Sequence, residues 1–111
     1  MKCTITTREI DGVAIFDIVG RMSFPDPHLQ NTLAVLLKEG HEGFVINLAG
    51  VTYMDSYGLH DLVTAYNAVT TAGARLVLSQ PNRNVRKTIE ITMKTIFTLF
   101  DDEAAAIEAV R

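Results

Sequence analysis

The segment Asp55-Ser56-Tyr57-Gly58 combines residue types and spacing that could carry chemistry. It follows the apolar run 44–48 and a turn expected over 49–54. Apolar residues then recur three and four positions apart, at Leu59, Leu62, Val63, Tyr66 and Val69. This pattern predicts a strand, a loop and a helix, with Asp55 or Ser56 as the N-cap residue. A serine at that point exposes its hydroxyl beside unpaired backbone N–H groups, which favours a phosphate that is either bound or covalently attached.

Ser56 has two other interpretations. It could simply cap the helix, because serine is a common N-cap residue, and a cap can also be a phosphate acceptor. It could also be the nucleophile of a serine hydrolase, because the nucleophilic serine of such enzymes lies between a strand and a helix. That motif requires glycine two residues earlier, where Met54 stands, and a downstream acid and histidine, whereas the last histidine is His60. Hydrolysis is therefore the remote alternative, the protein is not expected to be an enzyme, and no catalytic residue is assigned.

Histidine and cysteine spacing predicts neither a metal site nor a cofactor. His28, His41 and His60 are far apart and form no ligand motif. We expect His28 and His41 at the surface and His60 on a solvated helix face. Cys3 has no partner cysteine within the chain, so no internal disulfide can form, and no glycine-rich nucleotide loop occurs.

Composition predicts one soluble globular domain over residues 1–111, with 48% apolar and 21% charged residues. The net charge of −3 argues against nucleic-acid binding, which requires a basic face. No apolar run approaches the ~18 residues of a membrane-spanning helix, so direct membrane insertion is not expected. The start has no apolar signal region, and the single cysteine fits a reducing cytoplasm.

Alternating segments predict an α/β fold with a mostly parallel sheet of four to five strands and crossover helices. Asp11-Gly12 is a strong turn signal, so the first two strands are expected to form a hairpin. Prolines make 20–27 a loop. The expected strands span 3–10, 13–19, 44–48, 75–79 and 96–99, and the expected helices span about 28–39, 55–72, 84–92 and 102–110, in the order β-β-α-β-α-β-α-β-α.

Sites in parallel sheets gather at the carboxyl ends of the strands. At that edge we expect the loops 20–24, 50–56 and 79–82 to converge on Ser56. A small basic cluster, Arg83, Arg86 and Lys87, is either solvated surface or a contact for an acidic patch on a partner.

The element order and the run 51–59, with its Asp-Ser-x-Gly-Leu core, resemble the STAS domain family. Within it, the chain is similar to the free-standing bacterial anti-sigma factor antagonists, from about Thr4 to Ala109. The resemblance implies that the protein is phosphorylated and that it regulates transcription. Its serine, here Ser56, is phosphorylated by a partner that is both anti-sigma factor and serine kinase. The unphosphorylated form binds that partner, the phosphorylated form releases it, and a serine phosphatase resets the switch.

The resemblance assigns the motif positions Asp55, Ser56, Gly58 and Leu59. Gly58 would let the helix start lie close to the partner. We expect the partner to bind an apolar surface around Ser56, although each of its large residues could instead belong to the core. The expected partner-binding residues are Met22, Ser23, Phe24, Met54 and Tyr57.

Two departures from the family pattern favour either a divergent antagonist or a STAS module with another partner. Gly20-Arg21-Met22-Ser23 stands where the family often has Gly-Glu-Leu-Asp, so both acidic positions are lost. Tyr57 is large where a small residue is usual. The alternative function is a STAS scaffold of a stressosome-type or membrane lipid-transport complex, without phosphorylation. The sequence leaves the strand order and the oligomeric state open.

Overall fold

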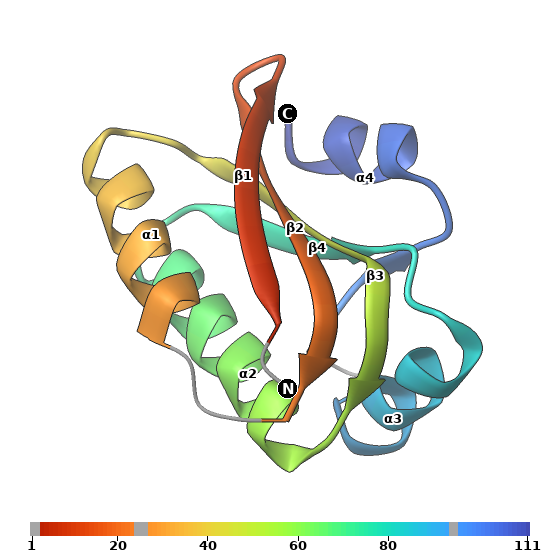
Figure 1. Cartoon of the computed structure of the whole chain (residues 1–111). Coiled ribbons are helices and arrows are strands. Elements are labelled where there is room, and N and C mark those ends of the chain that lie inside the picture. The colour runs from red at the N-terminus through yellow and green to blue at the C-terminus, as the bar shows by residue number, and fades with distance from the viewer. Residues whose placement is uncertain (1–2, 24–26, 94–95) are drawn as a thin grey trace.

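The computed structural model describes residues 3–23, 27–93 and 96–111 of the chain and shows a five-stranded sheet flanked by helices (Figure 1). The spatial order is β1-β2-β3-β4-β5; β1 and β2 are antiparallel and every later pair is parallel. This confirms the predicted α/β class and the hairpin. The strands are β1 (Thr4–Ile10), β2 (Val13–Met22), β3 (Gly43–Met54), β4 (Arg75–Ser79) and β5 (Leu99–Phe100), and the helices are α1 (Pro27–Lys38), α2 (Ser56–Thr71), α3 (Arg83–Met93) and α4 (Glu103–Val110).

Helices cover both faces of the sheet because the central strands are apolar on both sides. On one face, the sheet residues Phe16, Phe44 and Ile46 pack with apolar residues of α1, α2 and α3. On the other face, a smaller cluster joins the sheet to Ile107 and its neighbours on α4. Figure 1 shows this division, with α1 and α2 on one side of the strands and α4 on the other.

The two central strands are longer than the sequence predicts. β2 continues through Met22 and β3 through Met54, so the loop expected from residue 20 and the turn expected over 49–54 are wrong. The two strands remain paired to their ends, with register shifts at 17–19 and 20–21. Backbone pairing with a neighbour allows polar residues such as Arg21 to stay extended where the apolar pattern stops.

The helices lie close to their predicted positions. α1 and α3 each begin one residue earlier than expected, and the last strand is the pair 99–100 rather than 96–99. The inward positions Val85 and Ile89 on α3 are buried as predicted. Asp102 caps α4, because its carboxylate accepts a hydrogen bond from the Ala105 N–H at 2.8 Å, and this confirms the predicted cap.

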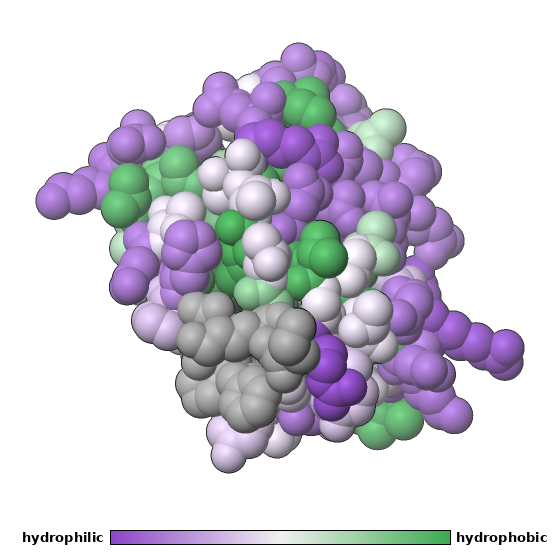
Figure 2. Space-filling view, in the orientation of Figure 1, coloured by the Kyte–Doolittle hydropathy of each residue, from purple (hydrophilic) through white to green (hydrophobic). Residues whose placement is uncertain are grey.

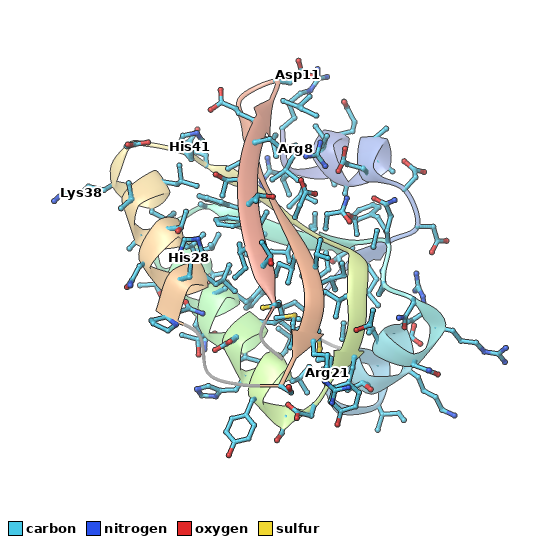
Figure 3. All side chains as sticks on the ribbon, in the orientation of Figure 1. Arg8, Asp11, Arg21, His28, Lys38 and His41 are labelled. Atoms are coloured by element: carbon cyan, nitrogen blue, oxygen red, sulfur yellow. The ribbon has the colours of Figure 1, made fainter. Side chains whose placement is uncertain are left out.

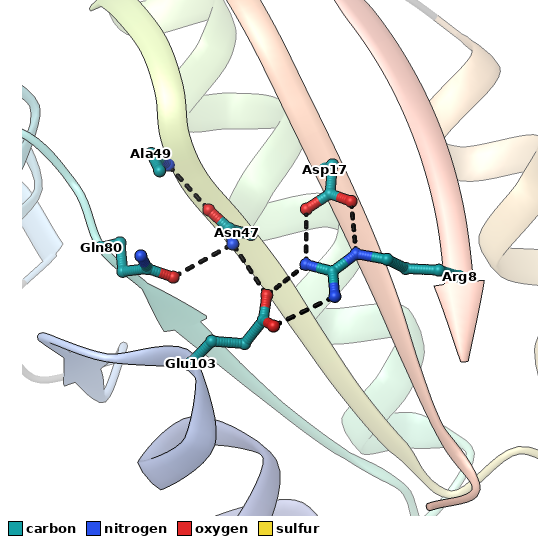
Figure 4. Close-up of polar contacts among 6 residues, drawn as sticks. All are labelled: Arg8, Asp17, Asn47, Ala49, Gln80 and Glu103. Atoms are coloured by element: carbon teal, nitrogen blue, oxygen red, sulfur yellow. Dashed lines mark hydrogen bonds and ion pairs between the residues drawn. The ribbon is translucent and has the colours of Figure 1, made fainter. Parts of the chain in front are cut away.

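A polar network on the α4 side of the sheet joins α4 to the N-terminal hairpin (Figure 4). Arg8 donates to both carboxylate oxygens of Asp17, at 2.6 and 3.0 Å, and to Glu103 of α4. The Asn47 amide also donates to Glu103, at 2.9 Å, and to Gln80, at 3.1 Å. The hydrogen bonds from Arg8 and Asn47 hold the pKa of Glu103 below its usual value, so this carboxylate stays charged.

Candidate functional site at the start of helix α2

Asp55 and Ser56 have separate roles at the start of α2. Asp55 is the N-cap: its backbone is extended, and its Oδ1 accepts a hydrogen bond from the Tyr57 N–H at 2.9 Å. Ser56 is the first residue of the helix, and its side chain is exposed. The interpretation of Ser56 as the cap is therefore wrong. The serine is exposed at the N-terminal end of the helix, where the backbone N–H groups have no partner within the helix.

The surroundings of Ser56 favour a negative charge. α2 is 16 residues long and carries no acidic residue in its first turn, so within the helix and its cap only Asp55 opposes the positive end of the dipole. A phosphate attached to Ser56 would lie beside this end. Such a charge is stabilising at a helix N-terminus, so the domain can accept it without losing its fold.

The ends of β2 and β3 fix the start of α2. Met22 and Met54 are register partners, and the Asp55 N–H donates to the Met22 carbonyl at 3.4 Å. Gly58 packs against the same carbonyl: a Cβ at this position would lie 2.3 Å from the Met22 oxygen and 3.0 Å from Met54 Cγ. This glycine therefore permits a close approach within the chain, and the contact with a partner that the sequence suggested for it stays a prediction.

The structure divides the expected partner-binding residues between core and surface. The side chains of Met22 and Met54 are only 3% and 5% exposed, so they belong to the core rather than to an open apolar surface. Tyr57 is 55% exposed, and Ser23 is half-buried. Phe24 lies outside the described residues. The space-filling view shows small, separate hydrophobic patches among hydrophilic residues (Figure 2).

Tyr53 and Arg21 form a pair beside this site that the sequence reasoning missed. The Arg21 guanidinium carbon lies 4.3 Å from the centre of the Tyr53 ring, within the range of a cation–π interaction. The two residues are register partners on β2 and β3, and both are exposed. Arg21 is labelled near the carboxyl ends of these strands in Figure 3. Because residues 49–54 were expected to form a turn, no cross-strand pairing could be predicted there.

The ends of β2 and β3, which replace two of the three predicted loops, meet at the start of α2, whereas the third loop does not. β4 ends at Ser79, level with Asn47 in the middle of β3, so the loop 79–82 lies beside the middle of β3. Its Asn82 amide donates to the Val51 carbonyl at 3.0 Å. The convergence of this third loop on Ser56 is therefore wrong, and the reason is the unexpected length of β3.

The remaining candidate residues lie apart from Ser56. His28 and His60 are exposed, as expected. His41 is not a free surface residue: its Nε2 lies 2.9 Å from Glu9 Oε1, and this hydrogen bond raises the pKa of His41. Within the described parts of the chain, no group of three or more histidine, cysteine or carboxylate side chains is placed to hold a metal ion.

In the basic cluster, Arg86 forms ion pairs with Glu90 and Asp101, whereas Arg83 and Lys87 are exposed. None of the described helices combines the length and the hydropathy that crossing a bilayer would require.

Solved structures similar to this one include several anti-sigma factor antagonists. An anti-sigma factor antagonist from Mycobacterium paratuberculosis superposes with a TM-score of 0.85 at 22% identity, covering 99% of this chain and 95% of that one. A candidate antagonist from Thermotoga maritima gives 0.80 at 20% identity, covering 96% and 94%. The Bacillus cell fate determinant SpoIIAA in its phosphorylated form gives 0.71 at 16% identity, covering 97% and 100%. At these identities, the likeness establishes the fold.

No curated protein sequence matches the chain closely. The sequence model of the STAS domain matches residues 4–106, which include every strand and the first half of the last helix. On this match, together with the sheet order and the strand–serine–helix unit, the chain belongs to the STAS domain family.

Proposed function

We propose that this protein is a bacterial anti-sigma factor antagonist that acts in the cytoplasm and is controlled by phosphorylation of Ser56. The observation that carries the proposal is the exposed hydroxyl-bearing residue at the first position of α2, with the cap already supplied by Asp55. In the unphosphorylated state the protein binds an anti-sigma factor that is also a serine kinase. The phosphorylated state releases it, and a serine phosphatase restores binding.

The proposed switch acts on binding rather than on folding. A phosphoserine adds about −1.5 to −2 charges, which the N-terminus of α2 tolerates while the surface is in water. In a complex, the same charge beside Tyr57 would have to be desolvated. A cost of roughly 3 kcal/mol would weaken the complex about a hundredfold. Asp55 stands next to the phosphate and would add to the repulsion of any anion on the partner.

The first experiment incubates the protein with ATP and a candidate anti-sigma factor kinase from the same genome, and maps the phosphate by mass spectrometry. We expect phosphate on Ser56, no phosphate in Ser56→Ala, and weakened kinase binding in Ser56→Glu. Thr64 is the matched control, because it is an exposed hydroxyl residue on the same helix, two turns further on. Thr64→Ala and Thr64→Glu should leave phosphorylation and binding unchanged. Phosphate at another residue, or equal binding by Ser56→Glu and wild type, would contradict the proposal.

A scaffold without phosphorylation is the second candidate. The observation that favours it is the pair Arg21 and Ser23, which occupies the positions where the antagonists often carry acidic residues. On this function, the protein would bind a stressosome-type assembly or a membrane lipid-transport complex. A stable complex with such a component, together with no phosphate on Ser56 in the kinase experiment, would favour the scaffold.

A further inference from the structure

The second half of β3 has a strand neighbour on one side only. β4 pairs with β3 along Gly43–Asn47, whereas β2 remains paired with β3 as far as Met54. Beyond Asn47, the other side of β3 therefore has no pairing strand among the described residues, and α3 packs there instead. An unpaired strand edge is a ready position for an added strand from another chain.

A groove lies between this edge and α3. It has a volume of about 260 Å³, and its lining is Thr52, Tyr53 and Met54 of β3 with Asn84, Val85 and Thr88 of α3. None of these residues carries a carboxylate. On the side toward the middle of β3, the hydrogen bond from Asn82 to the Val51 carbonyl closes the edge. The β3–α3 groove therefore offers room for a short extended segment, and it ends two residues before Ser56.

One cation lies against a lining residue of the β3–α3 groove, and two more lie nearby on α3. Arg21 lies over the ring of Tyr53 on the β2 side. Arg83 and Lys87 are exposed and directly precede the lining residues Asn84 and Thr88 on α3. The third cation of α3, Arg86, is already neutralised by its ion pairs with Glu90 and Asp101.

From the unpaired edge, the groove and the cations near it, we propose that the β3–α3 groove binds an extended acidic segment of the partner, which adds beside residues 52–54. This inference rests on the proposed function for the identity of the partner, an anti-sigma factor. Arg21, with Arg83 and Lys87 of α3, would pair with carboxylates of the segment. Arg21 would repel a partner that presents a basic docking face, so the groove should select a partner with an acidic segment.

The same groove explains how a phosphate could act. Ser56 follows Met54, the last groove residue of β3, by two positions. A phosphate there would repel an acidic segment and compete for the Arg21 guanidinium. Arg21 would attract the acidic segment before phosphorylation, and the phosphate would cancel that attraction afterwards.

The test uses nuclear magnetic resonance on the ¹⁵N-labelled full chain with two synthetic probes, a ten-residue glutamate-rich peptide and a lysine-rich peptide of the same length. We expect saturable shifts of the amides at 52–54 and 84–88 with the acidic peptide only. The dissociation constant should rise several-fold between low and physiological salt. Shifts scattered over the surface, or equal binding of both peptides, would overturn the proposal.

Charge-reversal variants separate a local contact from net charge. Arg21→Glu should weaken the acidic peptide about tenfold, and Lys87→Glu should weaken it by several-fold. Lys38→Glu changes the net charge by the same amount at the end of α1, which lies far from Arg21 in Figure 3, and should change binding less than about twofold. Retained dispersed spectra would show that each variant folds. Equal effects of Arg21→Glu and Lys38→Glu would refute the groove.

The outcome is separable from that of the proposed function. If Ser56 carries no phosphate but the acidic peptide binds specifically, the proposed antagonist role is refuted and the proposed groove is supported. If Ser56 is phosphorylated but the peptide does not bind in the groove, the proposed groove is refuted and the proposed antagonist role is supported. If both hold, Arg21→Glu should also weaken the anti-sigma factor complex, and an Arg or Lys placed in the acidic segment of the partner should restore it.

Discussion

Gly58→Ala is the change that tests the position of Ser56 most directly, because it adds a single methyl group where α2 touches β2. The new Cβ would lie 2.3 Å from the Met22 carbonyl oxygen and 2.6 Å from Met22 Cβ, distances that atoms in a relaxed structure do not adopt. The opposing oxygen belongs to the backbone of a paired strand, so it cannot rotate away as a flexible side chain would. The start of α2 must therefore move.

The expected cost combines two opposing effects. Overpacking of this kind costs up to about 3 kcal/mol. Alanine in place of glycine inside a helix returns about 1 kcal/mol through backbone entropy. The net loss should be about 2 kcal/mol, which is a large fraction of the ~5–15 kcal/mol that stabilises a typical domain. For a chain of this length the midpoint of thermal unfolding should fall by roughly 10 °C.

Urea unfolding followed by circular dichroism measures this loss. Ala68→Gly is the matched control, because Ala68 is an exposed position of the same helix. This control should lower the free energy of unfolding by about 1 kcal/mol, which is the difference in helix propensity between alanine and glycine alone. The displaced helix start should also slow phosphorylation of Ser56 if the proposed function holds. A Gly58→Ala protein as stable as wild type, or more stable, would refute the close packing of α2 on β2 and the geometry inferred for Ser56.

Three further predictions concern caps and charge pairs. Asp55→Ala should lower the free energy of unfolding by about 1 kcal/mol because it removes the N-cap, whereas Ser56→Ala should change it by less than ~0.5 kcal/mol; urea titrations of both variants distinguish the two roles. Glu103→Gln should cost roughly 1 kcal/mol at neutral pH, and, because the pKa of Glu103 is lowered from 4.5, the difference from wild type should vanish as the pH falls below that lowered pKa. Glu9→Gln should lower the free energy of unfolding by about 0.5 kcal/mol below pH 6.5, where His41 is charged. The difference from wild type should disappear as the pH rises through the raised pKa of His41. Equal losses at pH 5.5 and 9 in urea titrations would show that this pair carries no pH-dependent stability.

The local periodicities identified most of the elements. Apolar residues spaced for a helix placed α2, and a short β-rich run placed β4 at 75–79, because burial of one face is encoded within a few neighbouring residues. The pairing of β2 with β3 beyond Val19 was not predictable in this way. Arg21, Thr52 and Tyr53 have no apolar alternation, and they are extended only because each strand supplies the other with backbone partners.

The candidate site shows the same division. The segment 55–58 pointed to an exposed serine at a helix start, since capping chemistry depends on residues adjacent in the chain. Which residue caps depends on a hydrogen bond, and this was decided in favour of Asp55 only in the folded chain. Met22 and Met54 look like surface candidates in the sequence, yet the pairing of their strands beneath Gly58 buries both.

The sequence by itself determined the class of fold, the order of the elements and the place of Ser56 at a helix start, because these follow from hydrophobic spacing and from residue types along the chain. Only the tertiary structure decided what surrounds that residue. The Arg21–Tyr53 pair, the β3–α3 groove and the packing of Gly58 on β2 join segments that are 30 to 36 positions apart in the chain. Such contacts depend on strand register and length, which no local pattern specifies.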